Sequence, residues 1–415
     1  MSTICFVGTY PPMMCGIADY TSFLTRVMPS GYWGVLSFCL EDCEVPLTAG
    51  SKPADGPVWH GIPGMREYSS EVILDGVNKL GLNRSDCVIW FQHEFNIWQD
   101  SDAFVTMLKQ LDMPRIVTFH TLRFQSGETP FGFTAEEYKL LQDLLPNVDA
   151  ITVFSNGVCS AVYKAFPEYQ EKVFILKHGV HWYPEVSRLS RREAKEAFNT
   201  FLLDESELDT ETKEVLHKER IFLDPDTVVL GQTGFLHPIK GSEHIYITGE
   251  KLQKLLPQRR IVVIRIGKPR LPEYEPHVVE IRKQRNNKDR FLFEIWLPDN
   301  ILPLAQRAFD VNYYWPGDCT QSGILMHAFG ASAIVAGREL EGVGEMLKEA
   351  GALHDSDQNR LVEKIRDLIL DPGLQEEVQQ RAIDYARELS WENQARKHYR
   401  LAERFLTAPG IRTDK

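Results

Sequence analysis

The sequence predicts an α/β protein with two doubly wound domains, and three observations carry that prediction. Short apolar runs alternate with amphipathic stretches of helical length, as expected for βαβ units on a parallel sheet. The pattern ends near Leu176 and begins again at Val228. The stretch between the two patterns is highly charged and has no strong strand. A chain of 415 residues is long enough for two or three domains.

Each half of the chain supplies its own series of expected strands. Those of the first half are Ile4–Val7, Cys87–Phe91, Arg115–Phe119, Ala150–Phe154 and Val173–Leu176, with a helix near Ala18–Val27. Those of the second half are Val228–Leu230, Arg260–Ile266, Phe291–Glu294, Phe309–Tyr314 and Ala333–Val335, with a helix near Glu243–Leu256. The chain closes with two helical stretches, Asn359–Leu370 and Leu374–Leu406.

These patterns divide the chain into four segments. Residues 1–186 form the first domain, 187–226 a charged linker or insertion, 227–390 the second domain and 391–415 a C-terminal helical segment. Charge runs such as Asp204–Glu211 are most often solvated surface. We expect the last few residues, 409–415, to be a frayed tail.

Composition narrows the class of protein. The formal net charge is −12, which does not favour a nucleic-acid partner. The start of the chain lacks the layout of a signal peptide, and no apolar stretch is long enough to span a bilayer. The seven cysteines are irregularly spaced, and Cys39 and Cys43, the closest pair, have no second pair to complete a zinc site. We therefore expect a cytoplasmic protein with reduced thiols, for which peripheral membrane contact stays open.

Ligands in open α/β sheets bind at the carboxyl ends of the strands, so the loops there are the candidate sites. In the first half these are the loop Gly8–Gly16, the segment Gln92–Phe95, the segment Phe119–Thr121, and the segments Ser155–Asn156 and Lys177–Val180. Histidines at two strand ends, with a glutamate beside one of them, suit hydrogen bonding to a polyol. A structural histidine or an ordinary turn is the alternative at each position taken alone.

Two loops of the second half suit phosphate binding. In Gly234–Gly241, Lys240 comes just before an expected helix, where a cation and free backbone N–H groups meet. In Gly317–Gly323, small polar residues and a glycine precede another helix. Neither loop matches the glycine motif of dinucleotide-binding folds or the Walker motif of nucleotide-binding loops. No metal motif is evident, and Asp224-Pro-Asp226 lies in the linker, so we expect no metal site.

Taken in order, these motifs resemble those of a glycosyltransferase of the GT-B fold, close to the large family 4 of retaining, nucleotide-sugar-dependent enzymes. The resemblance runs over roughly residues 3–406. It rests on Thr9–Pro12, Cys15–Ala18, Gln92–Phe95, Thr118–Thr121, His178–Val180, Gly234–Leu236, Lys240–Gly241, Leu297–Asp299 and Thr320–Gly323. It implies two Rossmann-like domains facing across a cleft, with the C-terminal helix crossing back to the first. The first domain would bind the acceptor and the second the nucleotide sugar.

The resemblance also implies roles for individual residues. The expected catalytic group is His120, Lys240, His93 and Glu94; the expected donor-binding group is Gly16, Gly234, Lys240, Arg265, Gln321, Ser322 and Gly323; and the expected acceptor-side group is Tyr10, His93, Glu94 and His178. Lys240 and backbone N–H groups near Ser322 would stabilise the departing diphosphate, so such an enzyme needs no bound metal or cofactor. The donor would be a UDP- or GDP-linked sugar, and the acceptor a sugar, a glycan or a lipid-linked group.

Two departures from the family pattern qualify these expectations. Many relatives carry an arginine where Phe235 stands, and Arg265 or Lys268 is a possible replacement. Many also carry two glutamates in the later donor loop. In this chain the first glutamate's place falls near Asp318–Cys319, and the second is taken by His327. A non-catalytic GT-B binding protein and a GT-B phosphorylase that uses inorganic phosphate therefore stay open as alternatives. A nicotinamide dehydrogenase is disfavoured, because both halves lack its glycine fingerprint.

Overall fold

Two separate parallel sheets organise the chain in the computed structural model, which describes residues 2–41, 44–48 and 56–406. Residues up to Gly179, together with those from Trp391 on, form one compact unit. Val180–Ser390 form the second unit. The predicted frayed tail and Cys43 lie outside the described residues, and the six described cysteines are free thiols.

The first unit contains a seven-stranded sheet of order β3-β2-β1-β4-β5-β6-β7, in which every pairing is parallel. The order reverses between β1 and β4, so their carboxyl ends form the switch point of the sheet. The strands are β1 (Thr3–Val7), β2 (Trp33–Phe38), β3 (Val58–Ile62), β4 (Cys87–His93), β5 (Arg115–Phe119), β6 (Ala150–Val153) and β7 (Val173–Ile175).

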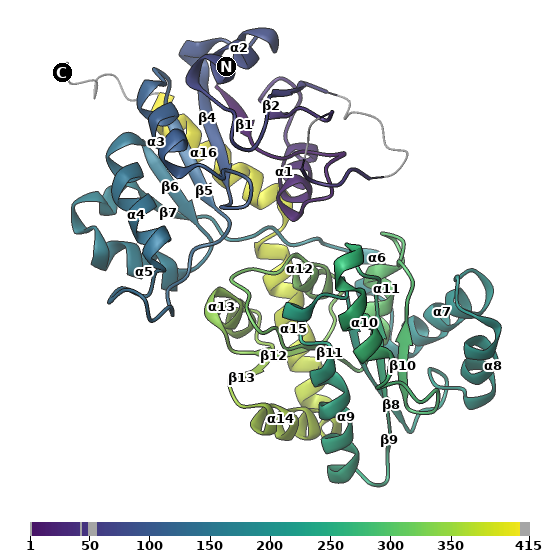
Figure 1. Ribbon diagram of the computed structural model, residues 1–415. Coiled ribbons are helices and arrows are strands. Elements are labelled where there is room, and N and C mark those ends of the chain that lie inside the picture. Colours follow the sequence, from purple (N-terminus) through teal and green to yellow (C-terminus); the bar gives the residue numbers. More distant parts are fainter. Residues whose placement is uncertain (1, 42–43, 49–55, 407–415) are drawn as a thin grey trace. The chain divides into compact units, whose positions relative to one another are not determined.

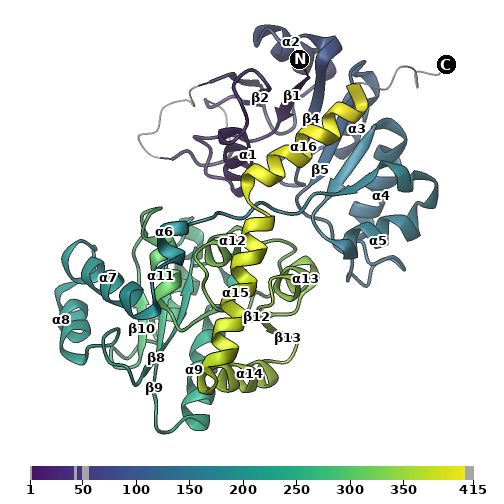
Figure 2. The same cartoon turned by 180° about the vertical axis from the view of Figure 1, so that it is seen from behind.

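Side chains alternate between the two faces of this sheet, and each face has its own helices. One face, with Phe91 of β4, packs against α2 (Ser70–Lys79), α3 (Ser101–Gln110), α4 (Ala135–Leu144) and α5 (Asn156–Ala165). The opposite face, with Trp90, packs against α1 (Gly16–Arg26) and the last helix α16 (Trp391–Leu406). Figure 2 shows α16 lying over this face in yellow, against strands that are far from it in sequence.

The second unit contains a six-stranded parallel sheet of order β10-β9-β8-β11-β12-β13, whose switch point lies between β8 and β11. The strands are β8 (Thr227–Thr233), β9 (Arg260–Ile266), β10 (Arg290–Phe293), β11 (Val311–Tyr314), β12 (Val335–Arg338) and β13 (Leu353–Asp355). Helices cover this sheet as well (Figure 1): α6 (Pro184–Ser187), α7 (Arg191–Asp204), α8 (Thr210–Glu219), α9 (Glu243–Leu255), α10 (Glu275–Arg282), α11 (Leu302–Ala308), α12 (Gly323–Gly330), α13 (Glu341–Glu349), α14 (Gln358–Leu370) and α15 (Pro372–Glu388).

The charged segment 187–226 belongs to the second unit and contributes to its core. Phe198 and Leu202 of α7 are buried against Val262 of β9. Lys195 Nζ lies 2.7 Å from a carboxylate oxygen of Asp310, which precedes β11. Apolar positions and the paired Lys195 thus anchor α7 to the sheet, while most other charges of the segment are exposed.

The predicted fold class is confirmed, whereas three strands escaped the sequence analysis: β2, β3 and β13. Glycines interrupt the apolar runs of β2 and β3 because other side chains need the space. A Cβ on Gly34 would lie 3.0 Å from Leu82, and one on Gly61 would meet the ring of Trp59. β13 is only three partly buried residues long, too short to show a pattern.

Candidate active site

The loop after β1 leads to a helix start that is open on its outer side. Cys15, which precedes α1, makes no capping hydrogen bond with its side chain. A Cβ built on Gly16 would have nothing within 4 Å among the described residues. The first N–H groups of a helix have no partner within the helix, so this start can accept an anion or a hydroxyl oxygen.

Tyr10, expected on the acceptor side, lies in the core. Its side chain is 4 % exposed, and its hydroxyl is 2.8 Å from Oγ1 of Thr25 on α1. Tyr10 therefore fixes α1 against the loop that precedes it.

The end of β4 sends consecutive side chains to opposite faces. His93 points into the core, where its ring packs against those of Phe95, Phe104 and Phe119 at centroid distances of 5.1, 5.0 and 4.9 Å. Both ring nitrogens are buried without a hydrogen-bond partner among the described residues. Burial lowers the pKa of His93 to about 3, so the ring is neutral at physiological pH.

Glu94 is held at the strand end by hydrogen bonds to both carboxylate oxygens. Thr121 Oγ1 donates to Oε2 at 2.5 Å, and the Phe95 backbone N–H donates to Oε1 at 3.2 Å. Burial nevertheless raises the pKa of Glu94 above its ordinary value. A partly desolvated carboxyl of this kind can accept a proton or bind a sugar hydroxyl.

His120 and His178 lie together around Tyr20 of α1. The two imidazole centroids are 5.0 and 5.1 Å from the Tyr20 ring, and both contacts are edge-to-face. His120 Nε2 donates to the side-chain oxygen of Gln92 at 2.7 Å, which leaves Nδ1 as its acceptor. Burial lowers the pKa of His120 to about 3 and that of His178 to about 4. The first unit thus gathers neutral imidazoles beside a carboxyl.

Lys240 occupies the turn between β8 and α9 in the second unit. Pro238 opens this short 3₁₀ turn, and Gly241 closes it in the left-handed region at φ +58°. A Cβ at Gly241 would fall 2.2 Å from the carbonyl oxygen of Trp315, so the turn requires glycine. Lys240 Nζ lies 6.0 Å from the centroid of the Tyr314 ring, and no carboxylate of the described residues pairs with it. Its charge is therefore available to an anion.

Arg265, expected to bind the donor, has its guanidinium turned into the backbone of the loop that follows β8. Its side chain is fully buried, and NH1 donates to the carbonyls of Gln232 and Gly234 at 3.3 and 2.9 Å. NH2 donates to the Phe235 carbonyl at 2.7 Å, and Nε donates to Ser242 Oγ at 3.0 Å. Burial lowers the pKa of Arg265 to about 10. The guanidinium thus shapes the loop, including Gly234 at φ +119°, and presents no charge to solvent.

A second open helix start follows β11. Ser322 precedes α12 without a side-chain cap, and a Cβ on Gly323 would have nothing within 4 Å among the described residues. Gln321 contributes a carbonyl that accepts from the Cys319 thiol at 2.8 Å. In the described part of the chain, a Ser, Thr or Asp side chain caps α2, α3, α4, α5, α7, α8, α14 and α15, whereas α12 and six other helices have no such cap. The first N–H groups of α12 are open to an anion, and α12 differs from most of the other uncapped helices in following a strand at the switch point of the sheet.

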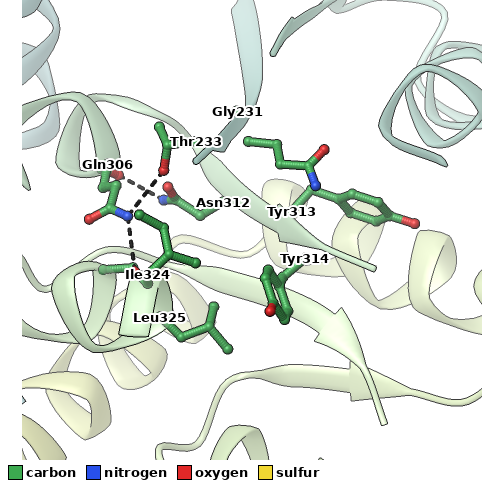
Figure 3. Close-up of a pocket in the computed structure, with 10 residues that line it drawn as sticks. Gly231, Thr233, Gln306, Asn312, Tyr313, Tyr314, Ile324 and Leu325 are labelled. Carbon is green, nitrogen blue, oxygen red and sulfur yellow. Dashed lines mark hydrogen bonds between the residues drawn. The ribbon is translucent and has the colours of Figure 1, made fainter. Parts of the chain in front are cut away.

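Gln306 of α11 is a positioning residue that the sequence analysis missed. Its amide donates to Thr233 Oγ1 at 3.2 Å and to the Ile324 carbonyl at 3.1 Å, joining the end of β8 to the start of α12 (Figure 3). A small pocket lies at this junction, lined by Gly231, Gln232, Thr233, Gln306, Asn312, Tyr313, Tyr314, Ile324, Leu325 and Ala328. The pocket marks the switch point of the second sheet. No sequence signal distinguishes this glutamine from others on amphipathic helices.

His327 stands in the place of an expected glutamate. Its side chain is part of an aromatic stack within the second unit. Its ring is parallel to that of His181, with centroids 4.1 Å apart, and its Nδ1 lies 2.6 Å from the Tyr183 hydroxyl. Burial raises the pKa of Tyr183 well above its ordinary range, so the phenol stays protonated. Cys319, near the other expected glutamate, lies 3.3 Å from the Tyr314 hydroxyl.

Phe235 is exposed, as is a second aromatic side chain beside it. The Phe235 and Trp296 rings are 38 % and 47 % exposed and meet edge-to-face at 5.2 Å. The Arg270 guanidinium lies 5.8 Å from the Phe235 centroid. Lys268, the other candidate for the missing arginine, pairs with Glu207 at 3.2 Å.

Neither a metal cluster nor a membrane-spanning helix is found in the described part of the chain. No three His, Cys, Asp or Glu side chains of those residues gather so as to hold a metal ion. The helices of the same residues are all too short or too polar to cross a bilayer.

The fold places the chain among GT-B proteins. Anabaena HepE, solved with UDP, matches with a TM-score of 0.64 and 12 % identity over 97 % of this chain and 100 % of that one. A UDP-forming trehalose-phosphate synthase from Burkholderia xenovorans matches with a TM-score of 0.64 and 12 % identity, over 98 % and 100 %. A glycosyltransferase from Rickettsia africae matches with a TM-score of 0.65 and 12 % identity, over 98 % and 99 %.

At this low identity the likeness defines the fold, which is GT-B with a Rossmann-like sheet in each unit. No protein-family model and no curated protein matches the sequence.

Proposed function

We propose that this protein is a glycosyltransferase that moves a hexosyl group from a UDP- or GDP-linked sugar to an acceptor, with retention of configuration as in family 4. The observation that carries the proposal is the switch point of the second sheet. There Lys240, which pairs with no carboxylate of the described residues, and the uncapped start of α12 lie on loops that follow adjacent strands, β8 and β11. Solved proteins of this fold have been crystallised with UDP or UDP-glucose.

The leaving group determines what the second unit has to supply. Breaking the bond between the sugar and the diphosphate leaves negative charge on a phosphate oxygen. Lys240 and the N–H groups at Ser322 and Gly323 stabilise that charge, and this is the main catalytic contribution we assign to them. Gln321 and Gly234 supply backbone around the phosphates, and Arg265 keeps the loop in place without touching the ligand.

The first unit supplies neutral hydrogen-bonding groups for sugar hydroxyls. His120, fixed by Gln92 with Nδ1 as acceptor, and Glu94, fixed by Thr121, are the two we assign to orientation of a sugar. His178 lies beside His120 in the same cluster, and Gly16 leaves room at the start of α1. His93 and Tyr10 act through packing. The acceptor is a sugar, a glycan or a lipid-linked group, and the first unit binds it.

The test is the Lys240→Ala variant, assayed for nucleotide binding by thermal shift and for donor consumption with UDP- and GDP-sugars. We expect turnover to fall by about a hundredfold or more, because one stabilising charge is removed from the developing anion. Lys268→Ala is the matched control, since this lysine lies on the next loop and pairs with Glu207. Undiminished binding and turnover in Lys240→Ala would contradict the phosphate role.

The same assays separate the alternatives. The tyrosine-bound His327, at the place of a donor-loop glutamate, favours a non-catalytic binding protein as the second candidate. Nucleotide binding by the wild type without consumption of any donor would replace the transferase by that candidate. Phosphate-dependent breakdown of a glycoside would instead identify a phosphorylase.

A further inference from the structure

The outer face of α16 carries a stripe of cations on an acidic protein. Arg396, Arg400 and Arg404 recur every four residues, so they line one side of the helix, and Lys397 borders them. All four side chains are exposed. The chain as a whole has a net charge of −12, so this stripe is opposite in sign to the net charge of the protein.

These cations are not neutralised by the rest of the described chain. Arg396 hydrogen bonds to the amide oxygen of Asn393, and the guanidinium of Arg404 lies 5.3 Å from the Phe174 centroid. Within residues 2–41, 44–48 and 56–406, no carboxylate forms an ion pair with any of the four. Glu392 and Glu403 border the stripe, and it keeps a net positive charge.

The opposite face of α16 packs against the first unit, so the stripe faces outward. Trp391, His398 and Leu401 are buried against the sheet face that carries Trp90. Figure 2 shows α16 along the surface of the first unit, with no other element drawn over its outer side. Half-buried Phe405 and Leu406 lie at its C-terminal end, and Phe405 contacts Phe174 at 6.3 Å.

We propose that this face of α16 binds reversibly to the surface of a bilayer rich in anionic phospholipids. The cations span nine residues, so the first and last are about 12 Å apart along the helix, without a cavity between them. They therefore cannot converge on one small anion, whereas a plane of headgroups presents many. Clusters of four or more Lys or Arg side chains on a helix are typical of binding to anionic headgroups. Such binding needs no apolar face, and the apolar face of α16 packs in the protein. The inference does not depend on the proposed glycosyl transfer.

The test measures co-sedimentation of the full chain with vesicles of phosphatidylglycerol and phosphatidylcholine in equal parts, and with vesicles of phosphatidylcholine alone. We expect binding only to the anionic vesicles, weakening as salt is raised because the Debye length shortens. Lys397→Gln with Arg400→Gln removes two cations that make no side-chain bond within the described chain, and should lower the partition coefficient about thirtyfold. Arg400→Gln alone should lower it about fivefold.

A matched control changes the net charge equally at another place. Lys109→Gln with Lys164→Gln alters exposed lysines at the ends of α3 and α5 in the same unit. Its partition should stay within twofold of the wild type. The proposal is overturned if the wild type ignores anionic vesicles at low salt, or if both double variants bind them equally.

Discussion

The two sheets share one strand order at their switch points but present different chemistry there. The first switch point gathers imidazoles that burial keeps neutral, with a carboxyl whose pKa is raised. The second presents a lysine without a carboxylate partner among the described residues and a helix start without a cap. Neutral donors and acceptors suit hydroxyl groups, and fixed positive charge suits phosphates. One architecture thus presents two kinds of chemistry because different residues follow the strands.

The largest expected effect concerns acid, and it should appear in the first unit. The pKa values of His93 and His398 fall from 6.5 in an unfolded chain to about 3 and about 4 in the folded one, because both rings are fully buried. Below pH 6.5 the unfolded chain therefore binds more protons than the folded chain. Stability should fall between pH 6.5 and about 4, by roughly 1.4 kcal/mol per pH unit for each histidine. Urea unfolding at a series of pH values measures this slope.

His93→Leu separates this cause from general acid effects. The leucine cannot titrate and leaves no orphaned ring nitrogen, so the slope should decrease while stability at neutral pH is kept or rises. His217→Leu, at an exposed position on α8, should leave the slope as in the wild type. Equal slopes for the wild type and His93→Leu would disprove the assignment.

A smaller effect on stability is expected in the second unit when the buried guanidinium of Arg265 is removed. Arg265→Met removes the donor of hydrogen bonds to three loop carbonyls and leaves them buried. The free energy of unfolding should fall by about 3 kcal/mol, and nucleotide affinity should fall with it because the loop loses its shape. Arg270→Met, which removes only a cation near Phe235, should cost less than about 1 kcal/mol. Similar losses in the two variants would show that Arg265 does not organise the loop.

The smallest effect tests the two open helix starts directly. Gly16→Ala and Gly323→Ala each add a methyl group that meets nothing within 4 Å among the described residues. Neither glycine has a positive φ, so each variant should keep or gain stability, by less than about 1 kcal/mol. Nucleotide affinity should nevertheless fall in Gly323→Ala, because the methyl group occupies the space assigned to phosphate. Isothermal titration with UDP and GDP checks this, and unchanged affinity would remove the start of α12 from the site.

Much of the fold was predictable from sequence because buried parallel strands are continuous apolar runs. The candidate loops followed from the same pattern, since ligands gather where strands end. The directions of individual side chains were harder to predict. Because side chains alternate along β4, Gln92 and Glu94 lie on one face of the sheet and His93 lies on the other. That alternation would have predicted His93 in the core. Nothing in the sequence shows that Arg265 points backward into carbonyls, because that depends on the path of a loop brought near by tertiary folding.

The last helix has a consequence for the order in which the protein can be made. Trp391, His398 and Leu401 of this helix complete the core of the first unit. The strands of that unit lie within the first 175 residues. During synthesis the early sheet therefore emerges with one apolar face covered by α1 but not by α16, and it stays so while Val180–Ser390 is being translated. At about 5–20 residues per second this interval lasts tens of seconds at the slower rates. The first unit can therefore complete the part of its core that α16 covers only after the second unit has been translated.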